Sequence, residues 1–370
     1  MTLLRLRPWW QSAGLVILAA MAGCAGAPPQ KAAEPSAAVF YPAAPDAPRI
    51  QHLTSFRGEG DFAAKLSSFQ QFLAGEEPGR GLVTIYGVAL FEGRVFAVDT
   101  KSAGIAIFDL NKQQFSVFAG AGAGKFKVPI NITIDTDGTR YVTDTGRNQV
   151  LRFDRDGGFL SAFGEPGQFR PIDAAVVGDK LYVVDLEHQE VQVLNKLTGK
   201  LLFKFGKGTT AATAMLHPTN IAIAPNGDVL VVDTSNFRIQ RFTAEGKHLR
   251  SFGEAGDTPG TFARPKGIAV DRSGNVYVSD AAFQNVQIFG ADDQLRMAFG
   301  QPNKGEAMSL PAAVKIDYDN VALFKKYADP KFAIEYLILV TSQVAPNKVD
   351  VFGFGRMAGF DYTQQTPAKP

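Results

Sequence analysis

The sequence is dominated by an internal repeat. Five apolar runs rich in Val, Leu and Tyr each end in an aspartate, and successive aspartates lie 41 to 48 residues apart. They are Asp99, Asp144, Asp185, Asp233 and Asp280. A sixth run, residues 335–341, ends in Thr341 after a longer step of 61 residues. Self-similarity at this period indicates one supersecondary unit copied six times, whose apolar faces are buried by stacking on one another.

Each copy predicts four short strands. A strand that begins with proline precedes the aspartate run, at Pro129, Pro171, Pro218 and Pro265. Turn signals such as Asp137-Gly138 lie between these two strands and are typical of tight hairpins. Two more apolar strands follow each aspartate. Four strands in so short a unit make one blade of a propeller, so the predicted fold class is all-β, a six-bladed β-propeller.

The order of these signals resembles a known family. A Pro-x-x-Ile-Ala-Val start, the terminal Asp and an Asn/Gln-x-Val-x-x-Phe strand recur in sequence, most clearly around Asp233 and Asp280. Over residues 50 to 355 the chain resembles the NHL repeat family. The resemblance implies a β-propeller, and its members commonly mediate protein contacts.

One segment predicts how the ring closes. Residues 50–56 match the fourth-strand pattern of residues 247–252, whereas no fourth strand is recognisable after residues 349–352. We therefore expect a propeller over residues 49–355, in which the N-terminal strand 50–56 completes blade six. A C-terminal tail, 356–370, follows. Pairing of the two chain ends leaves no open blade edge.

Two short helical insertions interrupt the repeats. In residues 319–334, Val321, Phe324 and Ala328 have helical spacing before Pro330. In residues 57–82, helical spacing links Phe62, Leu66, Phe69 and Leu73, between the N-cap candidate Asp61 and the C-cap candidate Gly75. Because chain direction alternates along a blade, we expect the insertions on opposite faces. The second either covers apolar surface near the closing blade or forms a lid over the channel.

The first 23 residues have the features of a signal peptide. A basic start precedes an apolar run, 14–21, which is too short to span a bilayer, and small residues precede Cys24. Met21-Ala22-Gly23-Cys24 resembles a bacterial lipobox, which implies lipidation of Cys24 and, with Ala25 after it, an outer-membrane location. An ordinary signal peptide with a chance cysteine is the alternative. Residues 24–48, rich in Ala and Pro, are expected to form an extended tether.

Charge and cysteine content exclude several classes of protein. The formal net charge is +2, and Arg5 and Arg7 lie in the expected signal peptide, so the exported chain is balanced. A nucleic-acid partner is not expected, because such binders need an excess of Lys and Arg. The single cysteine rules out an intramolecular disulfide, a Cys-rich zinc site and a C-x-x-C-H haem attachment.

Three polar residues hold the same position in successive blades and form a candidate channel ligand or ion site: Asn131, Asp173 and Asn220. Resemblance to lactonase-type propellers implies Ca²⁺ there. The equivalents Gly87, Gly267 and Ala313 supply no ligand, although Ca²⁺ takes six to eight oxygens. Capping of backbone groups where the strand begins is the alternative. The repeat aspartates, in contrast, are expected to accept turn N–H groups.

The four histidines do not suggest a catalytic zinc site. His52 and His248 are expected on outer strands, and the two loop histidines cannot supply three ligands. Arginines, aromatic residues and histidines on loops of one face form a candidate partner face, because Arg and aromatic residues are enriched in protein interfaces. They are Arg147, Arg170, His188, His217, Phe237, Arg238, Arg264 and Phe283.

These observations leave two functions open. The first is a non-catalytic, membrane-anchored lipoprotein of the cell envelope, whose propeller binds or scaffolds a protein partner. Similarity of residues 41–50 to lipoproteins that accompany multihaem cytochromes implies such cytochromes as neighbours. The alternative is a periplasmic metal-dependent lyase or lactonase-like hydrolase that uses Asp173, with Asn131 and Asn220, in the channel.

Overall fold

The structure is a computed structural model that describes residues 38–62, 81–300 and 308–362. The predicted signal peptide, Cys24 and the first part of the tether lie outside these residues, as do Leu66, Phe69, Leu73 and Gly75 of the insertion before blade 1. In the described ranges, no helix has both the length and the apolar character needed to cross a membrane.

The strands of the described residues form six antiparallel sheets, one for each predicted repeat. Blade 1 contains β3 (Ile85–Phe91), β4 (Arg94–Asp99), β5 (Gly104–Asp109) and β6 (Gln114–Phe118). Blade 2 contains β7 (Pro129–Ile134), β8 (Arg140–Asp144), β9 (Gln149–Phe153) and β10 (Phe159–Phe163). Blade 3 contains β11 (Pro171–Val177), β12 (Lys180–Asp185), β13 (Glu190–Asn195) and β14 (Leu201–Phe205). Blade 4 contains β15 (Pro218–Ile223), β16 (Val229–Asp233), β17 (Arg238–Phe242) and β18 (His248–Phe252). Blade 5 contains β19 (Pro265–Val270), β20 (Val276–Asp280), β21 (Asn285–Phe289) and β22 (Leu295–Phe299).

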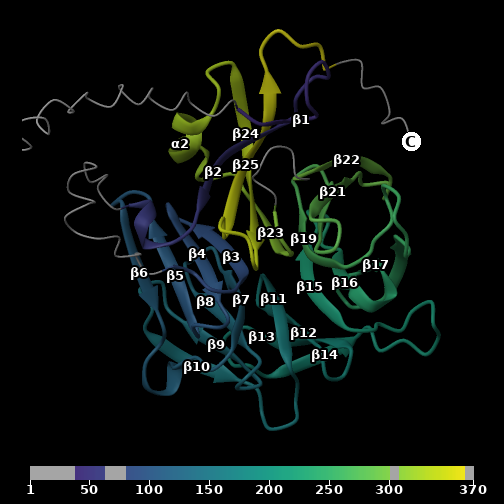
Figure 1. Cartoon of the computed structure of the whole chain (residues 1–370). Helices are drawn as coiled ribbons and strands as arrows, with labels where there is room; N and C mark the ends of the chain where they lie inside the picture. Colours follow the sequence, from purple (N-terminus) through teal and green to yellow (C-terminus); the bar gives the residue numbers. More distant parts are fainter. Residues whose placement is uncertain (1–37, 63–80, 301–307, 363–370) are drawn as a thin grey trace, which may run out of the picture. The chain divides into compact units, whose positions relative to one another are not determined.

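The innermost strands form the ring. From blade 1 to blade 5 each packs against the next, and β23 (Pro311–Asp317) of blade 6 packs against both β19 and β3 (Figure 1). The predicted all-β, six-bladed β-propeller is confirmed.

The core lies between neighbouring blades. Phe96 and Val98 of blade 1 share one cluster with Val142 and Leu151 of blade 2, and all four are fully buried. Burial of a side chain of this size contributes about 1.5–3 kcal/mol relative to exposure. Stacking of neighbouring blades therefore buries apolar side chains that a single blade would leave exposed, as the repeat pattern predicts.

Blade 6 is closed by the N-terminal strand. β2 (Ile50–Phe56) pairs antiparallel with β25 (Val349–Met357), which pairs with β24 (Phe332–Ser342). The register places Phe56 opposite Val349 and Thr54 opposite Val351. The closure expected from the match between residues 50–56 and 247–252 is therefore present in the structure.

Secondary structure extends beyond both expected limits of the propeller. The tether was expected to reach residue 48, but β1 (Phe40–Tyr41) pairs with β2 as a fifth strand of blade 6. The ring of Tyr41 packs against those of Phe299 and Phe352, which holds this segment to the blade. At the other end, β25 continues to Met357, and the hydroxyl of Tyr362 donates to the carbonyl of Pro48 at 2.7 Å.

The register of blade 6 corrects one sequence assignment. Pro311 pairs with Ser342, as Pro129 pairs with Asp144, so Ser342 and not Thr341 holds the place of the repeat aspartate. Ser342 Oγ accepts the N–H of Ser309, whereas Thr341 Oγ1 accepts the N–H of Ala313. An eleven-residue strand without Asp at its end gave no signal to fix this register.

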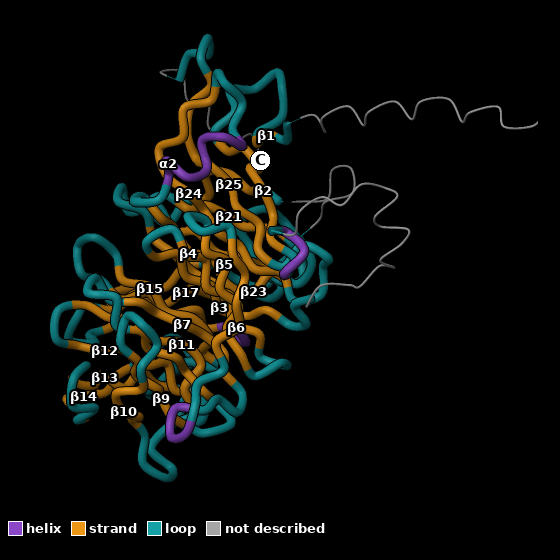
Figure 2. The backbone as a smooth tube through the Cα atoms, turned by 90° about the vertical axis from the view of Figure 1, so that its left-hand side faces the viewer, coloured by secondary structure: helices purple, strands orange, loops and turns teal. Residues whose placement is uncertain are grey.

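The insertion in blade 6 contains the predicted helix, although it is short. α2 (Val321–Phe324) continues as a 3₁₀ turn, Lys325–Tyr327, and lies beside β24 (Figures 1 and 2). Phe324 is fully buried. Asn320, just before the helix, accepts the N–H of Gly93 at 2.7 Å and so links the insertion to the first hairpin of blade 1.

Leu53 and Leu249 offer a matched test of the closure. They hold the same position in aligned strands, but Leu53 is 8% exposed, within a core cluster that includes Phe324, and Leu249 is 43% exposed. We predict that Leu53→Ala lowers the free energy of unfolding by about 2–4 kcal/mol and Leu249→Ala by less than about 1 kcal/mol. Urea denaturation measures both. Equal losses would mean that β2 is not packed into the ring.

Candidate functional site

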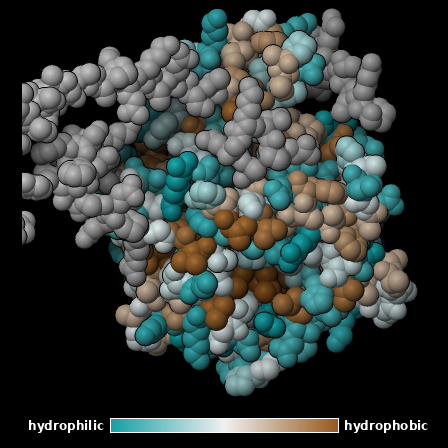
Figure 3. Space-filling model, viewed as in Figure 1, coloured by the Kyte–Doolittle hydropathy of each residue, from teal (hydrophilic) through white to brown (hydrophobic). Residues whose placement is uncertain are grey.

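The innermost strands bring the predicted polar trio to one level of the ring. Asn131, Asp173 and Asn220 are each the third residue of their strand, and each is at most 2% exposed. In the space-filling view, hydrophobic residues gather over these innermost strands (Figure 3). The trio therefore lies inside the ring wall and not on an open surface.

Asp173 and Asn220 are in contact across two blades. Asp173 Oδ2 accepts Asn220 Nδ2 at 3.2 Å and the N–H of Ile221 at 3.1 Å, while Oδ1 accepts the N–H of Ala174 at 2.8 Å. Burial raises the pKa of Asp173, and the nearby charge of Lys315 opposes the rise. The carboxyl group thus links blade 3 to blade 4.

Asn131 lies apart from this pair. Its Oδ1 accepts the N–H of Ile132 at 2.9 Å and occupies the space beside Gly87, where a Cβ would collide with it. The Nδ2 of Asn131 and the Oδ1 of Asn220 are buried without a hydrogen-bond partner among the described residues. Glycine at position 87 is required for this close approach of blades 1 and 2.

The trio does not fit a calcium ion as it stands. Both oxygens of Asp173 and the Oδ1 of Asn131 already accept hydrogen bonds, which leaves Asn220 Oδ1 as the free side-chain oxygen. Ca²⁺ takes six to eight oxygens, usually including more than one carboxylate. Lys315 also places a positive charge near Asp173. The contacts of Asn131 and Asp173 instead match the capping alternative, because each of these two side chains accepts a backbone N–H, and Asn220 donates to Asp173.

Cations and a phenol lie near the same level of the ring. Lys266 belongs to blade 5 and Tyr86 to blade 1, the two neighbours of blade 6 in the ring. The Nζ of Lys266 lies 5.1 Å from the centroid of the Tyr86 ring. Burial lowers the pKa of Lys266 to about 8, and the charge of Arg264 adds to this effect. Burial raises the pKa of Tyr86, with a further contribution from Asp173. The ring interior is therefore a poor environment for an added cation.

The repeat aspartates have the predicted structural role. Asp144 accepts the N–H groups of Gly146 and Arg147 in the turn that follows, and those of Lys127 and Val128 before β7. Asp280 makes the corresponding contacts in blade 5. Each carboxylate joins the turn after the second strand to the residues before the first.

Most residues of the predicted partner face lie in these turns or beside the innermost strands. We define the partner face as the loops between second and third strands together with the residues just before each innermost strand. Arg238 is held by Asp233, with Nε 2.9 Å from Oδ2, and Arg147 donates to the carbonyl of Lys125 at 2.8 Å. His217 is exposed and lies 3.0 Å from Ser235 Oγ. Arg170 and Arg264 are exposed, and Phe237 and Phe283 are half-buried.

Exposed aliphatic side chains accompany them. Val83, Val128 and Leu216 each stand one or two residues before an innermost strand, and Val344 lies in the loop between β24 and β25. Their exposed fractions are 43%, 37%, 41% and 62%. The sequence alone does not identify these residues, because whether a side chain just before a strand is exposed depends on the packing of the neighbouring blade.

His52 and His248 lie on outer strands, as predicted. Each ring stands 3.0 Å from the hydroxyl of a serine three residues later, Ser55 or Ser251. Each also packs edge-on against a phenylalanine of the adjacent strand, Phe352 or Phe242. They stabilise the outer edges of blades 6 and 4.

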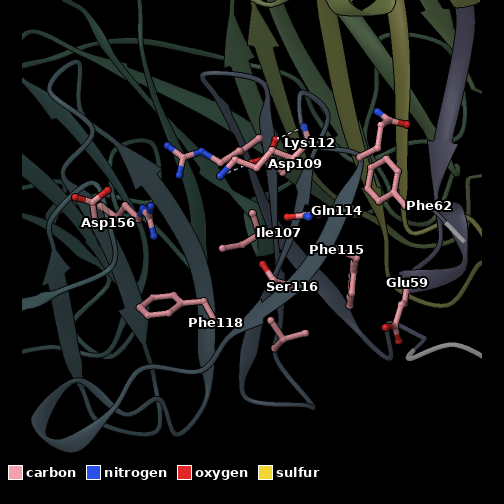
Figure 4. Close-up of a pocket in the computed structure, with 14 residues that line it drawn as sticks. Glu59, Phe62, Ile107, Asp109, Lys112, Gln114, Phe115, Ser116, Phe118 and Asp156 are labelled. Atoms are coloured by element: carbon pink, nitrogen blue, oxygen red, sulfur yellow. Dashed lines mark hydrogen bonds and ion pairs between the residues drawn. The ribbon is translucent and has the colours of Figure 1, made fainter.

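Two cavities lie away from the ring axis. One, of about 700 Å³, follows β6; Phe115 lies towards Glu59 and Phe62, and Phe118 lies on the other side of the cavity, nearer Asp156 (Figure 4). The other, of about 550 Å³, is lined by Gln168, His188 and Gln192, with Gly199 and Lys204 at its outer side. The donor atoms of Asp185, His188 and Glu190 lie within 4.8 Å of one another beside this second cavity. From the sequence, His188 was expected on the partner face, but its grouping with Asp185 and Glu190 was not predicted.

Comparison with known proteins supports the repeat assignment. Residues 215–242 match the family described as NHL repeat. Protein brain tumor of Drosophila melanogaster is 27% identical over 135 residues, which are 34% of this chain and only 12% of that protein.

Two solved structures share the fold. A catalytically inactive virginiamycin B lyase from Staphylococcus aureus, in complex with quinupristin, is 14% identical and has a TM-score of 0.53 over 73% of this chain and 95% of its own. A gluconolactonase from Xanthomonas campestris is 16% identical, with a TM-score of 0.54 over 86% and 97%. At such identities the likeness concerns the fold alone.

Asp173 gives the site a testable pH signature. Because its pKa is raised in the folded chain, the protonated form stabilises the fold; this contribution is fully present below the ordinary pKa of about 3.9 and is lost as the pH rises through the raised value. Asp173→Asn removes the titration. We therefore predict that the difference in unfolding free energy, unmodified chain minus variant, falls as the pH rises through this range. Urea denaturation of both chains at several pH values measures this difference. A difference that does not change with pH would contradict the burial of this carboxyl group.

Proposed function

Because the chain is a six-bladed β-propeller of NHL repeats, we propose that it is a non-catalytic binding module that presents its partner face to another protein. The observation that carries this proposal is the combination of exposed Val83, Val128 and Leu216 with exposed arginines on that face. Arginine is enriched in protein interfaces, and the buried centre of an interface is more apolar than its rim.

The contacts within the partner face favour a preformed surface. The repeat aspartates hold the turns through several backbone N–H groups each, and Arg238 is fixed by Asp233. A surface whose backbone is already fixed loses little conformational entropy on binding. The face therefore suits recognition of a partner without rearrangement of its loops.

The partner face can be tested against equally exposed residues elsewhere. We predict that Val128→Glu with Leu216→Glu abolishes capture of the native partner when cells are cross-linked gently and the chain is purified from the membrane fraction. The control pair is Val177→Glu with Leu197→Glu, at 46% and 57% exposure on the loops of the opposite face. Loss with the control pair, or retention with the first, would contradict the proposal. Multihaem cytochromes among the captured proteins would support the resemblance of residues 41–50.

We also propose that the module is exported and anchored in the cell envelope, at the outer membrane, through lipidated Cys24. The sequence features of residues 1–24 support this proposal, and Cys24 is the single cysteine of the chain. Several acyl chains anchor a protein stably, because each buried CH₂ contributes about 0.8 kcal/mol.

The anchor has a simple test. In Cys24→Ser the acceptor thiol is gone, so we predict that the exported chain moves from the membrane pellet to the soluble envelope fraction with its fold intact. Fractionation followed by immunoblotting measures this shift. Unchanged membrane association would overturn lipidation as the anchor, and Met21→Leu, which keeps the lipobox pattern, serves as the control.

The alternative function is a metal-dependent lyase or lactonase-like hydrolase in the channel. The Nδ2 of Asn131 and the Oδ1 of Asn220 favour it, because they are buried with no hydrogen-bond partner in the part of the chain that the structure describes, and buried polar atoms usually have one. It requires the hydrogen bonds of Asp173 to be exchanged for metal contacts. Metal analysis after mild purification separates the two functions: stoichiometric calcium that is lost in Asp173→Ala would favour the enzyme.

A further inference from the structure

Blade 3 differs from the other blades at the end of its second strand. Asp185, which ends β12, is followed by His188 in the turn and by Glu190 at the start of β13. Asp185 Oδ2 lies 2.6 Å from His188 Nδ1, and all three donor atoms lie within 4.8 Å of one another. Asp185 is fully buried and the side chain of Glu190 is 6% exposed.

Comparison with the equivalent positions of blade 4 shows how the surroundings of the repeat aspartate differ in blade 3. There Asp233 Oδ2 accepts three donors, namely Asn236 Nδ2 at 2.8 Å, Arg238 Nε at 2.9 Å and Gln240 Nε2 at 2.8 Å. In blade 3 the glutamine is retained as Gln192, but the arginine is replaced by Glu190. The same position is uncharged in blades 1, 2 and 5, as Gly104, Gln149 and Asn285, so blade 3 is the blade that places a second carboxylate beside its repeat aspartate.

The exchange leaves two buried carboxylates beside each other. Lys204 donates to Glu190 Oε1 at 2.9 Å, but its side chain is 49% exposed, so water weakens this ion pair. Buried charges without close compensation are strongly unfavourable. The position between Asp185 and Glu190 therefore attracts a cation, and His188 points a nitrogen at the same place.

The donor set specifies which cation fits. One imidazole and two carboxylates are ligands that divalent transition metals such as Zn²⁺ accept, whereas Ca²⁺ and Mg²⁺ prefer oxygen alone. Gln192 Nε2 donates to Asp185 Oδ2 at 3.0 Å and lies 3.3 Å from Glu190 Oε1, so one amide orients both carboxylates. Such outer hydrogen bonds are what metal ligands in proteins usually receive.

We propose that Asp185, His188 and Glu190 form a binding site for a divalent transition-metal ion, with Zn²⁺ as the best-fitting probe. The ion takes the place of the proton shared by Asp185 Oδ2 and His188 Nδ1. Ligands of a tetrahedral Zn²⁺ lie about 3.3 Å apart, so these two atoms separate by about 0.7 Å on binding, which the half-exposed His188 allows. The neighbouring cavity of about 550 Å³, lined by His188 and Gln192, leaves the fourth position open to water or to an external donor.

The experiment uses the full chain, freed of metal with a chelator and titrated with Zn²⁺ by calorimetry. We predict one Zn²⁺ per chain, and an affinity more than about tenfold weaker in both His188→Ala and Glu190→Gln. His217→Ala and Glu187→Gln are the matched controls, since they remove a histidine and a carboxylate side chain from the same face and keep the backbone N–H that Glu187 donates to Asp185. Titration with Co²⁺ adds an absorption spectrum that reports imidazole and carboxylate coordination directly.

Lys204→Met provides a gain-of-binding test that does not depend on a damaged fold. It removes the cation that competes for Glu190, so Zn²⁺ affinity should rise severalfold, whereas a purely structural Asp185–His188 pair would show no change. Absence of stoichiometric binding, equal binding by His188→Ala, or an equal loss in His217→Ala would each overturn the proposal. Circular dichroism of every variant establishes that the comparison is between folded chains.

Discussion

The pairing of β2 with β25 is the interaction on which the rest of this structure depends. It joins strands from near the two ends of the described chain within one blade and so fixes the ring at six sheets. Because strand direction alternates in each sheet, closure also determines which loops share a face. The arrangement of the partner face follows from this closure, as does the position of the cavity beside β6, whose lining includes Glu59 and Phe62 just after β2.

A second constraint, the aspartate that ends each second strand, explains why functional variation is confined to particular positions. In blades 1, 2, 3 and 5 it binds backbone N–H groups on both sides of the turn, so neither the turn nor the carboxylate can change freely. In blade 4 it binds the N–H of Leu216 on one side and the side chain of Asn236 on the other. The side chains of the third and fifth residues after it can vary, because the turn is held through backbone N–H groups such as those of Arg147 and His188. Blade 4 uses Asn236 and Arg238 there, and blade 3 uses His188 and Glu190. A repeat can thus acquire new chemistry without losing its fold.

Much of the fold was predictable from the sequence because each repeat carries independent signals for its turns, strand ends and aspartate. The closing strand was predictable for the same reason, since Leu53 to Phe56 repeat the pattern of Leu249 to Phe252. β1 was not, because two residues have no periodicity and Phe40 and Tyr41 are ordered by rings from elsewhere in the fold. Thr341 was misassigned by one residue, because only pairing with Pro311 distinguishes it from Ser342.

Residue spacing predicted the positions of the candidate site residues but not their contacts. Equivalence of Asn131, Asp173 and Asn220 placed them correctly at one level, but only the structure revealed that Asp173 binds Asn220 while Asn131 turns towards Gly87. Counting histidines alone argued against a zinc site, whereas comparing the fifth residue after each repeat aspartate would have singled out Glu190. A lyase and a gluconolactonase share this fold at low sequence identity, and a shared propeller fold does not by itself imply the same catalytic activity. Here the ring interior is occupied by Lys266, Lys315 and a carboxyl group of raised pKa, while Asp185 and Glu190 lie beside His188 at the partner face, with the half-exposed Lys204 as the cation next to Glu190. Cation chemistry in this chain is therefore expected at the rim of blade 3, where a protein partner would meet it, and not on the axis.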